Sequence, residues 1–502
     1  MRTTGSLASL ALALPALVSA AKDCKPYVDA EKLQDLINLD DLLAGSQKLQ
    51  EFADAHGGHR AFGSGGHNAT VDYLYDTLVA TNYFDVVKQP FTEIYADGKA
   101  TLAVDGQSVP AGIMTYTPGG SATGPVVLVP GLGCTPDSFP AEVEGKVAMV
   151  SRGECTFGEK SRSAKAAGAA ALIIYNNVPG SLSGTLGEAF GDYAPVVGIS
   201  AEDGQAIVAA LEDGEVTVDL QIHATVEERV NFNVIAETKG GDHDNVLVLG
   251  GHSDSVTAGP GINDDGSGII GVLNVALALT RFRVKNAVRF AFWGAEEFGL
   301  LGSYYYIKQV NQSDVELSKI RAYLNFDMIA SPNYIYGIYD GDGDAFNLTG
   351  PPGSDVLERD FEDFFDSMNL PHVPTEFSGR SDYAAFIENG IPSGGLFTGA
   401  EQLKTPEEAA LFGGDAGVAY DVNYHLIGDD INNLNHDAFY VNTLSIANSV
   451  AKYAISFDSL EPVDVAKRHA AAERARLFKR TGVSSHGHSH SHSGPCGGND
   501  KR

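Results

Sequence analysis

Histidine and carboxylate side chains recur just after apolar, strand-like runs over about 75 residues, and this pattern constrains the fold more than any other feature of the sequence. The runs are Asn245–Leu249 before His252 and Asp254, Ala287–Trp293 before Glu296 and Glu297, and Tyr323–Phe326 before Asp327. Ligands of open α/β sheets lie at the carboxyl ends of the strands. Histidine nitrogen and carboxylate oxygen together favour a metal centre that is assembled from several loops.

The segment from about 230 to 457 repeats the order strand, loop, helix. This alternation predicts an α/β protein, a three-layer α/β/α sandwich with a mixed, largely parallel central sheet. Residues 28–90 have helical apolar spacing, so we expect one discontinuous domain over 28–99 and 223–457. Residues 100–222 instead contain short β-like runs separated by glycine and proline, which predicts an inserted β-rich domain.

Length and charge narrow the class of protein. A chain of 502 residues is too long to fold around one ordinary hydrophobic core, so two domains are expected. The formal net charge of −31 argues against nucleic acid or an anionic membrane as a partner. Residues 1–20 have the charged start, short apolar run and small-residue end of a signal peptide. The alternative, a membrane anchor, would need a longer apolar run.

Other features fit export from the cell. Three glycosylation sequons begin at Asn68, Asn311 and Asn347. In an oxidising compartment, Cys134 and Cys155 can close a loop of about 20 residues, worth ~3 kcal/mol, while Cys24 and Cys496 are left unassigned. The tail, 458–502, carries histidines that can bind metal, but we expect it to be disordered and open to processing at Lys479-Arg480.

Each donor has a chemical rationale. Asp254 lies two residues after His252, so in an extended segment its carboxylate can orient the imidazole. The turn that holds Asp264 and Asp265 supplies a carboxylate that can bridge two cations. The repulsion within the adjacent pair Glu296-Glu297 favours one glutamate on a metal and the other facing a water. The last nitrogen donor is either His425 or His436, and spacing alone does not decide between them.

The motifs of several other hydrolases are missing from the sequence. It contains no His-Glu-x-x-His helix, no Gly-x-Ser-x-Gly elbow at a strand-to-helix turn, and no Walker-type loop. The ordered motifs that are present resemble the M28 family of metallo-aminopeptidases, with secreted fungal leucine aminopeptidases and vacuolar aminopeptidase Y as the nearest branch. They are 252–254, 259–268, 293–297, 325–329 and 379–383.

The resemblance implies two zinc ions and a role for each residue. His252 and Asp327 would bind one zinc, Glu297 and His425 the other, and Asp264 both. Glu296 would be the general base and acid. Tyr424 would donate to the oxyanion, and Asp254 and Asp265 would support the ligands. In the family the peptide bond that matches Asp264–Asp265 is cis. Residues 100–222 resemble a protease-associated domain through 153–157 and 164–175.

The expected activity is release of N-terminal amino acids, apolar ones such as leucine, from peptides with a free N-terminus. Arg380 would contact substrate, or else pair with Asp382, and Met328 and Phe397 would line the side-chain pocket. We expect a secreted monomer, with the vacuole as the second choice of location. The residues that flank His425 differ from those found at this place in some bacterial members of the family. Two rivals are a carboxypeptidase or dipeptidase of related fold and a non-catalytic ectodomain, which would tend to lose ligands.

Overall fold

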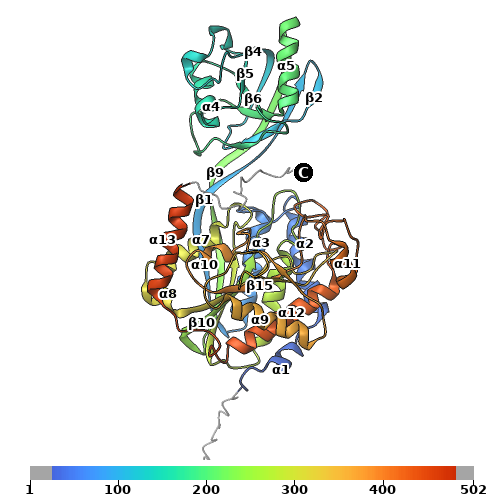
Figure 1. Ribbon diagram of the computed structural model, residues 1–502, viewed down its shortest axis with the longest axis vertical. Coiled ribbons are helices and arrows are strands. Elements are labelled where there is room, and N and C mark those ends of the chain that lie inside the picture. The colour runs from blue at the N-terminus through green and yellow to red at the C-terminus, as the bar shows by residue number, and fades with distance from the viewer. Residues whose placement is uncertain (1–24, 482–502) are drawn as a thin grey trace, which may run out of the picture.

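A computed structural model describes residues 25–481 and shows a large α/β domain with a smaller domain standing above it on a two-stranded ribbon (Figure 1). The expected signal peptide, Cys24, Cys496 and the His-rich tract lie outside the described residues. Within 25–481, no helix has both the length and the apolar character needed to cross a bilayer.

The large domain is built on a mixed sheet in the order β14-β13-β15-β12-β10-β11-β9, and β1 pairs with the outer side of β9. The pairs β10–β11, β10–β12 and β12–β15 are parallel, whereas β9 runs antiparallel to β11 and to β1. The expected mixed, largely parallel sheet is therefore confirmed. The strands are β1 Phe84–Val104, β9 Thr217–Thr238, β10 Asp242–His252, β11 Asn286–Trp293, β12 Ile320–Phe326, β13 Gly337–Tyr339, β14 Val373–Thr375 and β15 Ser393–Phe397.

Helices cover both faces of this sheet, as alternation along the central strand requires. In β10, Leu247 and Leu249 pack under one helical layer, while Val246 and Val248 pack under the other. The first layer comprises α1 Ala30–Gln34, α2 Leu39–Ala55, α3 Gly65–Ala80, α6 Gly266–Leu279, α9 Ser354–Ser367 and α12 His436–Tyr453. The second comprises α7 Leu301–Val310, α8 Asp314–Lys319 and α10 Tyr383–Ile387. A short helix, α11 Pro406–Phe412, lies in the long connection between β15 and α12.

The inserted domain has its own core around a short parallel sheet. Strands β4, β5, β6 and β8 lie side by side, and β4 also pairs with β9. The elements are β2 Gln107–Val109, β3 Gly112–Thr115, β4 Gly120–Leu128, η1 Pro136–Ser138, η2 Ala141–Val143, β5 Val147–Ser151, α4 Phe157–Ala166, β6 Ala171–Tyr175, β7 Gly184–Thr185, β8 Val196–Ile199 and α5 Ala201–Asp213. The expected bond between Cys134 and Cys155 is present.

The ribbon that carries the insert is formed by β1 and β9, which stay paired from Phe84↔Thr238 to Val104↔Val218. The expected boundaries at 100 and 222 lie inside these two strands. The pattern of residues changes there because β1 and β9 pass from the core of one domain into the core of the other. The domain bounds themselves stay a prediction.

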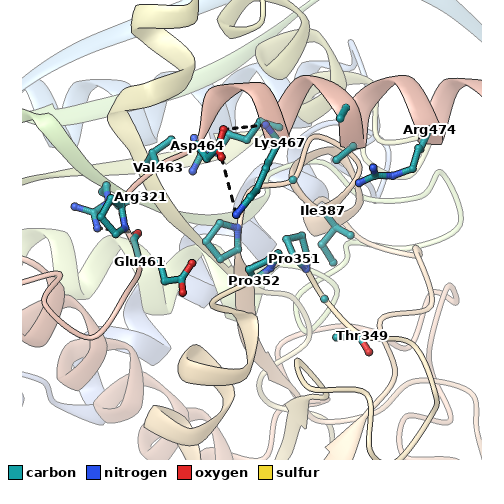
Figure 2. Close-up of a pocket in the computed structure, with 17 residues that line it drawn as sticks. Arg321, Thr349, Pro351, Pro352, Ile387, Glu461, Val463, Asp464, Lys467 and Arg474 are labelled. Atoms are coloured by element: carbon teal, nitrogen blue, oxygen red, sulfur yellow. Dashed lines mark hydrogen bonds and ion pairs between the residues drawn. The ribbon is translucent and has the colours of Figure 1, made fainter.

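The expectation of disorder after residue 458 is wrong for its first part, because Val465–Thr481 form helix α13. Arg468 anchors this helix from a buried position by donating to the carbonyls of Leu317 and Ile320. A hollow of about 540 Å³ lies between α13 and the loop around Pro351 (Figure 2). The sequence pattern gave no sign that a basic side chain of this charged segment would be buried.

The three sequons differ in accessibility. Asn68 and Asn347 are exposed, whereas Asn311 is partly buried and its side-chain amide donates to Asn389 at 2.5 Å. Two of the sites are therefore open to modification in the folded chain, and the third is engaged within it.

Candidate metal centre

The candidate centre lies where three neighbouring strands end. His252 is the last residue of β10, Asp327 directly follows β12, and Glu296 and Glu297 follow β11 by three and four residues. Because β12, β10 and β11 are adjacent and parallel, their carboxyl ends meet at one edge of the sheet. The fold thus brings together donors that are up to 75 residues apart in sequence.

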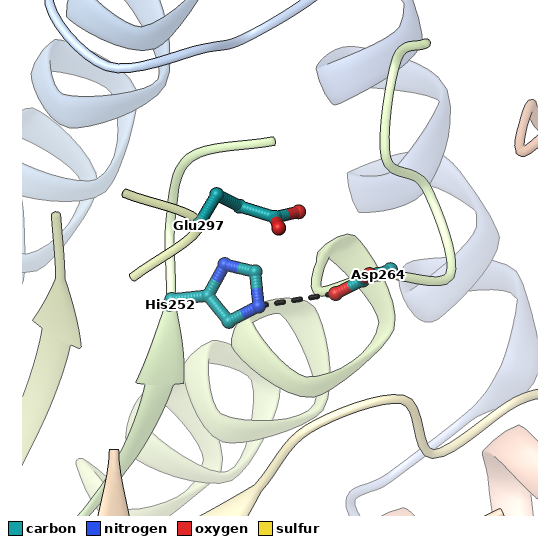
Figure 3. Close-up of side chains that lie close together, drawn as sticks. All are labelled: His252, Asp264 and Glu297. Atoms are coloured by element: carbon teal, nitrogen blue, oxygen red, sulfur yellow. Dashed lines mark hydrogen bonds and ion pairs between the residues drawn. The ribbon is translucent and has the colours of Figure 1, made fainter. Parts of the chain in front are cut away.

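Asp264, just before α6, lies between two imidazoles. His252 Nε2 is 3.1 Å from its Oδ1 atom, and His425 Nε2 is 3.2 Å from its Oδ2 atom. Figure 3 shows the His252 side of this arrangement, with Glu297 facing the same space. The Asp264–Asp265 peptide is cis, as expected from the resemblance. The two oxygens of the Asp264 carboxylate thus face two different imidazoles, those of His252 and His425.

The other donors divide between these groups. Asp327 Oδ1 lies 3.7 Å from His252 Nε2, and Glu297 Oε2 lies 3.0 Å from His425 Nε2. His436, the alternative nitrogen donor, is exposed at the first residue of α12. The structure therefore brings His425 to the cluster and leaves His436 outside it.

The residues present fit metal ions by the chemistry of their donors. Imidazole nitrogens paired with carboxylate oxygens are the ligands that zinc binds in catalytic sites. Ligand atoms of His252, Asp264 and Glu297 lie within 4.8 Å of one another. The Oε1 atom of Glu297 is buried and has no hydrogen-bond partner among the described residues. A buried carboxylate oxygen without a partner is costly unless a cation compensates for it.

Without a cation, the cluster retains protons. Burial raises the pKa of Glu296 well above its ordinary value, and the charges of Glu297 and Asp327 raise it further against the opposing effect of His252. Burial opposes the protonation of His425, but Glu297 and Asp264 raise its pKa to about 11. Such groups give up protons when a metal binds, because the metal takes the place of the positive charge.

Asp265 supports the ligands through backbone hydrogen bonds. Its Oδ2 atom accepts the N–H of His252 at 3.0 Å, and its Oδ1 atom accepts those of Gly268 and Met328 at 3.0 and 3.1 Å. The carboxylate thereby caps α6 and joins the ends of β10 and β12. Asp265 also falls within ligand distance of His252 and Asp327, but both its oxygens are already used as acceptors.

The contact between Asp254 and His252 differs in detail from the expected one, in which the Asp254 carboxylate orients the imidazole. His252 Nδ1 lies 3.2 Å from the backbone carbonyl of Asp254 and 3.7 Å from its Oδ1 atom. The carboxylate sits back because Oδ1 also accepts the N–H of Glu296. The main-chain carbonyl is therefore the closer partner of the imidazole, and the side chain links two strand ends.

On the substrate side, Arg380 does not form the considered ion pair with Asp382. Its Nη1 atom lies 2.7 Å from Glu401 Oε1, and its Nη2 atom donates to the hydroxyl of Tyr424 at 3.1 Å. The Tyr424 ring stacks on His425 with centroids 3.8 Å apart. Met328 is buried beside Asp327, whereas Phe397 is partly exposed at the end of β15. Their role in a side-chain pocket stays a prediction.

Several supporting residues escaped sequence analysis. Asp429 accepts the backbone N–H groups of Asn263 and Asp264 at 2.8 and 3.0 Å. Ser381 donates to Asp327 Oδ2 at 2.5 Å. Ser381 lies in a motif that was recognised, but its contact was not foreseen, and the surroundings of Asp429 offer no motif at all.

Two residues from the N-terminal segment also reach the loop after His252. The imidazole of His67 is buried, and its Nε2 atom lies 2.9 Å from Ser253 Oγ. Arg60, fully buried, donates to the carbonyl groups of this loop. Only their burial, which sequence spacing does not report, distinguishes these polar residues from ordinary surface ones.

Comparison with known proteins gives consistent matches to both parts of the chain. The model of peptidase family M28 matches residues 233–450, and the PA domain model matches residues 122–207. A protein of Aspergillus fumigatus named probable leucine aminopeptidase 2 is 55% identical over 479 residues, covering 95% of this chain and 94% of its own. Leucine aminopeptidase 2 of Arthroderma otae is 52% identical, covering 90% and 92%.

Solved structures with the same fold include bacterial aminopeptidases. An aminopeptidase from Aneurinibacillus sp. strain AM-1 matches with a TM-score of 0.63 at 26% identity, over 87% of this chain and 99% of that one. BSAP, a zinc aminopeptidase from Bacillus subtilis, matches with a TM-score of 0.59 at 25% identity, over 84% and 99%.

Proposed function

Because this chain belongs to peptidase family M28 and is a metallo-aminopeptidase with a PA domain, we propose that it is a secreted, monomeric enzyme with two zinc ions. It would release apolar N-terminal residues such as leucine. The observation that carries the proposal is the placement of Asp264, whose two oxygens face His252 and His425. A carboxylate shared in this way is typical of two-metal hydrolases.

The proposed ligand sets follow the two groups around Asp264. His252 and Asp327 would hold one zinc, and Glu297 and His425 the other, with Asp264 common to both. Bound zinc would polarise the scissile carbonyl and acidify a water molecule. The buried carboxylates also provide the negative surroundings that a cationic substrate amine needs. This requirement for a free amine would restrict cleavage to the first peptide bond.

Glu296 is the proposed general base and acid. Its Oε2 atom lies 3.8 Å from His252 Nε2, so the carboxylate reaches the same space as the ligands without pairing as closely as Asp264. It would take the proton of the attacking water and pass it to the leaving amine. Burial raises its pKa, which favours a group that can hold a proton between these two steps.

Tyr424 is the proposed donor to the oxyanion. Burial raises the pKa of its hydroxyl well above the ordinary value, with the charge of Asp264 adding to the effect, and the phenol therefore stays protonated. Arg380 donates to the phenol oxygen, so the phenol's own hydrogen is free to point toward substrate. A hydrogen bond that strengthens as charge develops on the carbonyl oxygen lowers the barrier. Met328 and Phe397 would line the pocket for the first side chain.

Export is supported by features of the folded chain. Cys134 and Cys155 form a disulfide, which persists in oxidising compartments. Asn68 and Asn347 are exposed sequons and would carry glycans. Recovery of glycosylated enzyme from the culture medium supports secretion, whereas enzyme confined to the vacuole contradicts it.

Three versions of one leucine-initiated peptide test the activity. The free peptide and its C-terminal amide should release leucine at similar rates, and the N-acetylated peptide should release none. A carboxypeptidase would show the opposite pattern, cleaving the acetylated peptide and failing on the amide. Metal analysis of the purified chain should give two zinc ions, and removal with a chelator should abolish turnover until zinc is restored.

A further inference from the structure

Arg60 lies between α2 and α3, has no exposed surface, and directs its guanidinium at one loop. Nε donates to the carbonyl of Pro260 at 2.8 Å, and Nη1 and Nη2 donate to those of Ser253 and Gly261, each at 2.5 Å. This loop connects His252 to Asp264. A side chain outside the family match at 233–450 therefore holds the segment between two proposed ligands.

Backbone carbonyls alone do not account for a buried charge. Taking a guanidinium out of water is costly, and neutral carbonyl partners repay only part of that cost. Burial lowers the pKa of Arg60, and the nearby carboxyl groups of Asp254, Asp429, Asp265 and Asp264 oppose this effect and favour the charged form. These four carboxyl groups are buried, so any of them that is ionised in the metal-free protein repels the others.

We propose that Arg60 is a positioning residue of the metal centre, whose fixed positive charge offsets the buried carboxylates while no metal is bound. This inference rests on the proposed zinc centre. Once zinc supplies positive charge, the contribution of Arg60 becomes smaller, because the same carboxylates are then neutralised by the metal. The charge of Arg60 and the binding of zinc are therefore thermodynamically coupled.

The chain contains a matched control for this coupling. Arg468 is also buried and donates to two backbone carbonyls, those of Leu317 and Ile320. Its electrostatic neighbour is the cation Arg321 rather than a group of carboxylates. Replacing either arginine by methionine leaves carbonyls without donors, but only the change at position 60 removes charge from the centre.

The test compares melting temperatures of the full chain with zinc and after removal of zinc by chelator. Wild type should gain stability on zinc loading, and Arg60→Met should gain roughly 3–6 °C more than wild type does, the scale of one to two kcal/mol in a large domain. Arg468→Met should melt lower than wild type by the same amount in both states. Arg60→Lys, which keeps the charge, should restore the wild-type gain even if its melting temperature is lower.

A gain for Arg60→Met that is equal to or smaller than that of wild type overturns the inference, because Arg60 would then be purely structural. If Arg60→Met does not fold, Arg60→Gln, which keeps a donor for the carbonyls and removes the charge, decides the matter: a zinc gain no larger than that of wild type contradicts a role for the charge. If zinc does not stabilise the wild type at all, the proposed zinc centre fails instead, and the two failures are distinguishable.

Discussion

The backbone N–H of Glu296 donates to the Oδ1 atom of Asp254 over 3.1 Å, across the ends of two neighbouring strands. The same oxygen lies 3.7 Å from the imidazole of His252. One carboxylate thus fixes the main chain of the proposed base relative to a proposed ligand. The position of Glu296 is set by the end of β10 as much as by its own strand.

Glu296→Gln should keep its zinc and lose turnover by roughly a hundredfold or more, the scale of a lost general base. The amide has nearly the same shape, and the backbone contact with Asp254 does not involve the changed group. The measurements are kcat on a leucine amide and zinc content of the same preparation. Near-normal turnover would remove Glu296 from the role of base.

His425→Ala should lose about one zinc ion per chain, because its Nε2 atom faces both Asp264 and Glu297. His436→Ala, changed at an exposed position only 11 residues later, is the matched control and should keep both ions. Metal analysis of the two variants after identical dialysis makes the comparison. Equal zinc content in the two proteins would contradict the ligand assignment.

Asp429→Ala should lower both the melting temperature and kcat. It leaves the N–H groups of Asn263 and Asp264 without their acceptor, at a cost of about 2 kcal/mol or more, and it frees the proposed bridging residue to move. Asp430→Ala is the control, since among residues 25–481 its carboxylate accepts only the backbone N–H of nearby Asn432. Thermal melts and initial rates of both variants suffice, and equal effects would show that the anchor is dispensable.

His67 should make the metal-free protein less stable as the pH falls. Burial lowers its pKa to about 4, against about 6.5 in the unfolded chain. The unfolded state therefore binds a proton between these values, and stability decreases from pH 6.5 to pH 4, by up to roughly 3 kcal/mol. Below pH 4 His67 is protonated in both states, so the loss of stability is complete and no longer changes with pH.

His67→Gln should flatten this pH dependence, because glutamine can still donate to Ser253 but does not titrate. Unfolding free energies of chelator-treated protein between pH 4 and pH 7 provide the measurement, with exposed His436→Gln as the control that keeps the wild-type slope. An unchanged slope in His67→Gln would assign the effect to other groups.

The sequence predicted most of the sheet and of the ligand cluster because both follow short-range patterns. Apolar runs locate the strands, and donors that directly follow parallel strands must meet at one edge. His252, Glu297 and Asp327 could therefore be placed together before the structure was known. The choice between His425 and His436 needed either the family resemblance or the fold, since both lie in a long loop region.

The supporting contacts were not predictable for a physical reason. Arg60 and Asp429 act on backbone groups of other segments, and a carbonyl or N–H group has no sequence signature. His67 reaches the hydroxyl of Ser253, 186 residues away in sequence, which spacing does not indicate. Helix α13 was missed for a similar reason, because Arg468 anchors it through two backbone carbonyl groups of another segment. Charge and low complexity indicated disorder where a specific anchor exists.

The ribbon of β1 and β9 has a consequence for the connectivity of the chain. The chain leaves the catalytic domain and returns to it at positions that are directly paired, such as Thr92 and Val230. The whole insert is therefore a long hairpin loop in topological terms. It can be gained, exchanged or shortened to a tight turn without rethreading any strand of the central sheet, so the two domains are free to diversify separately.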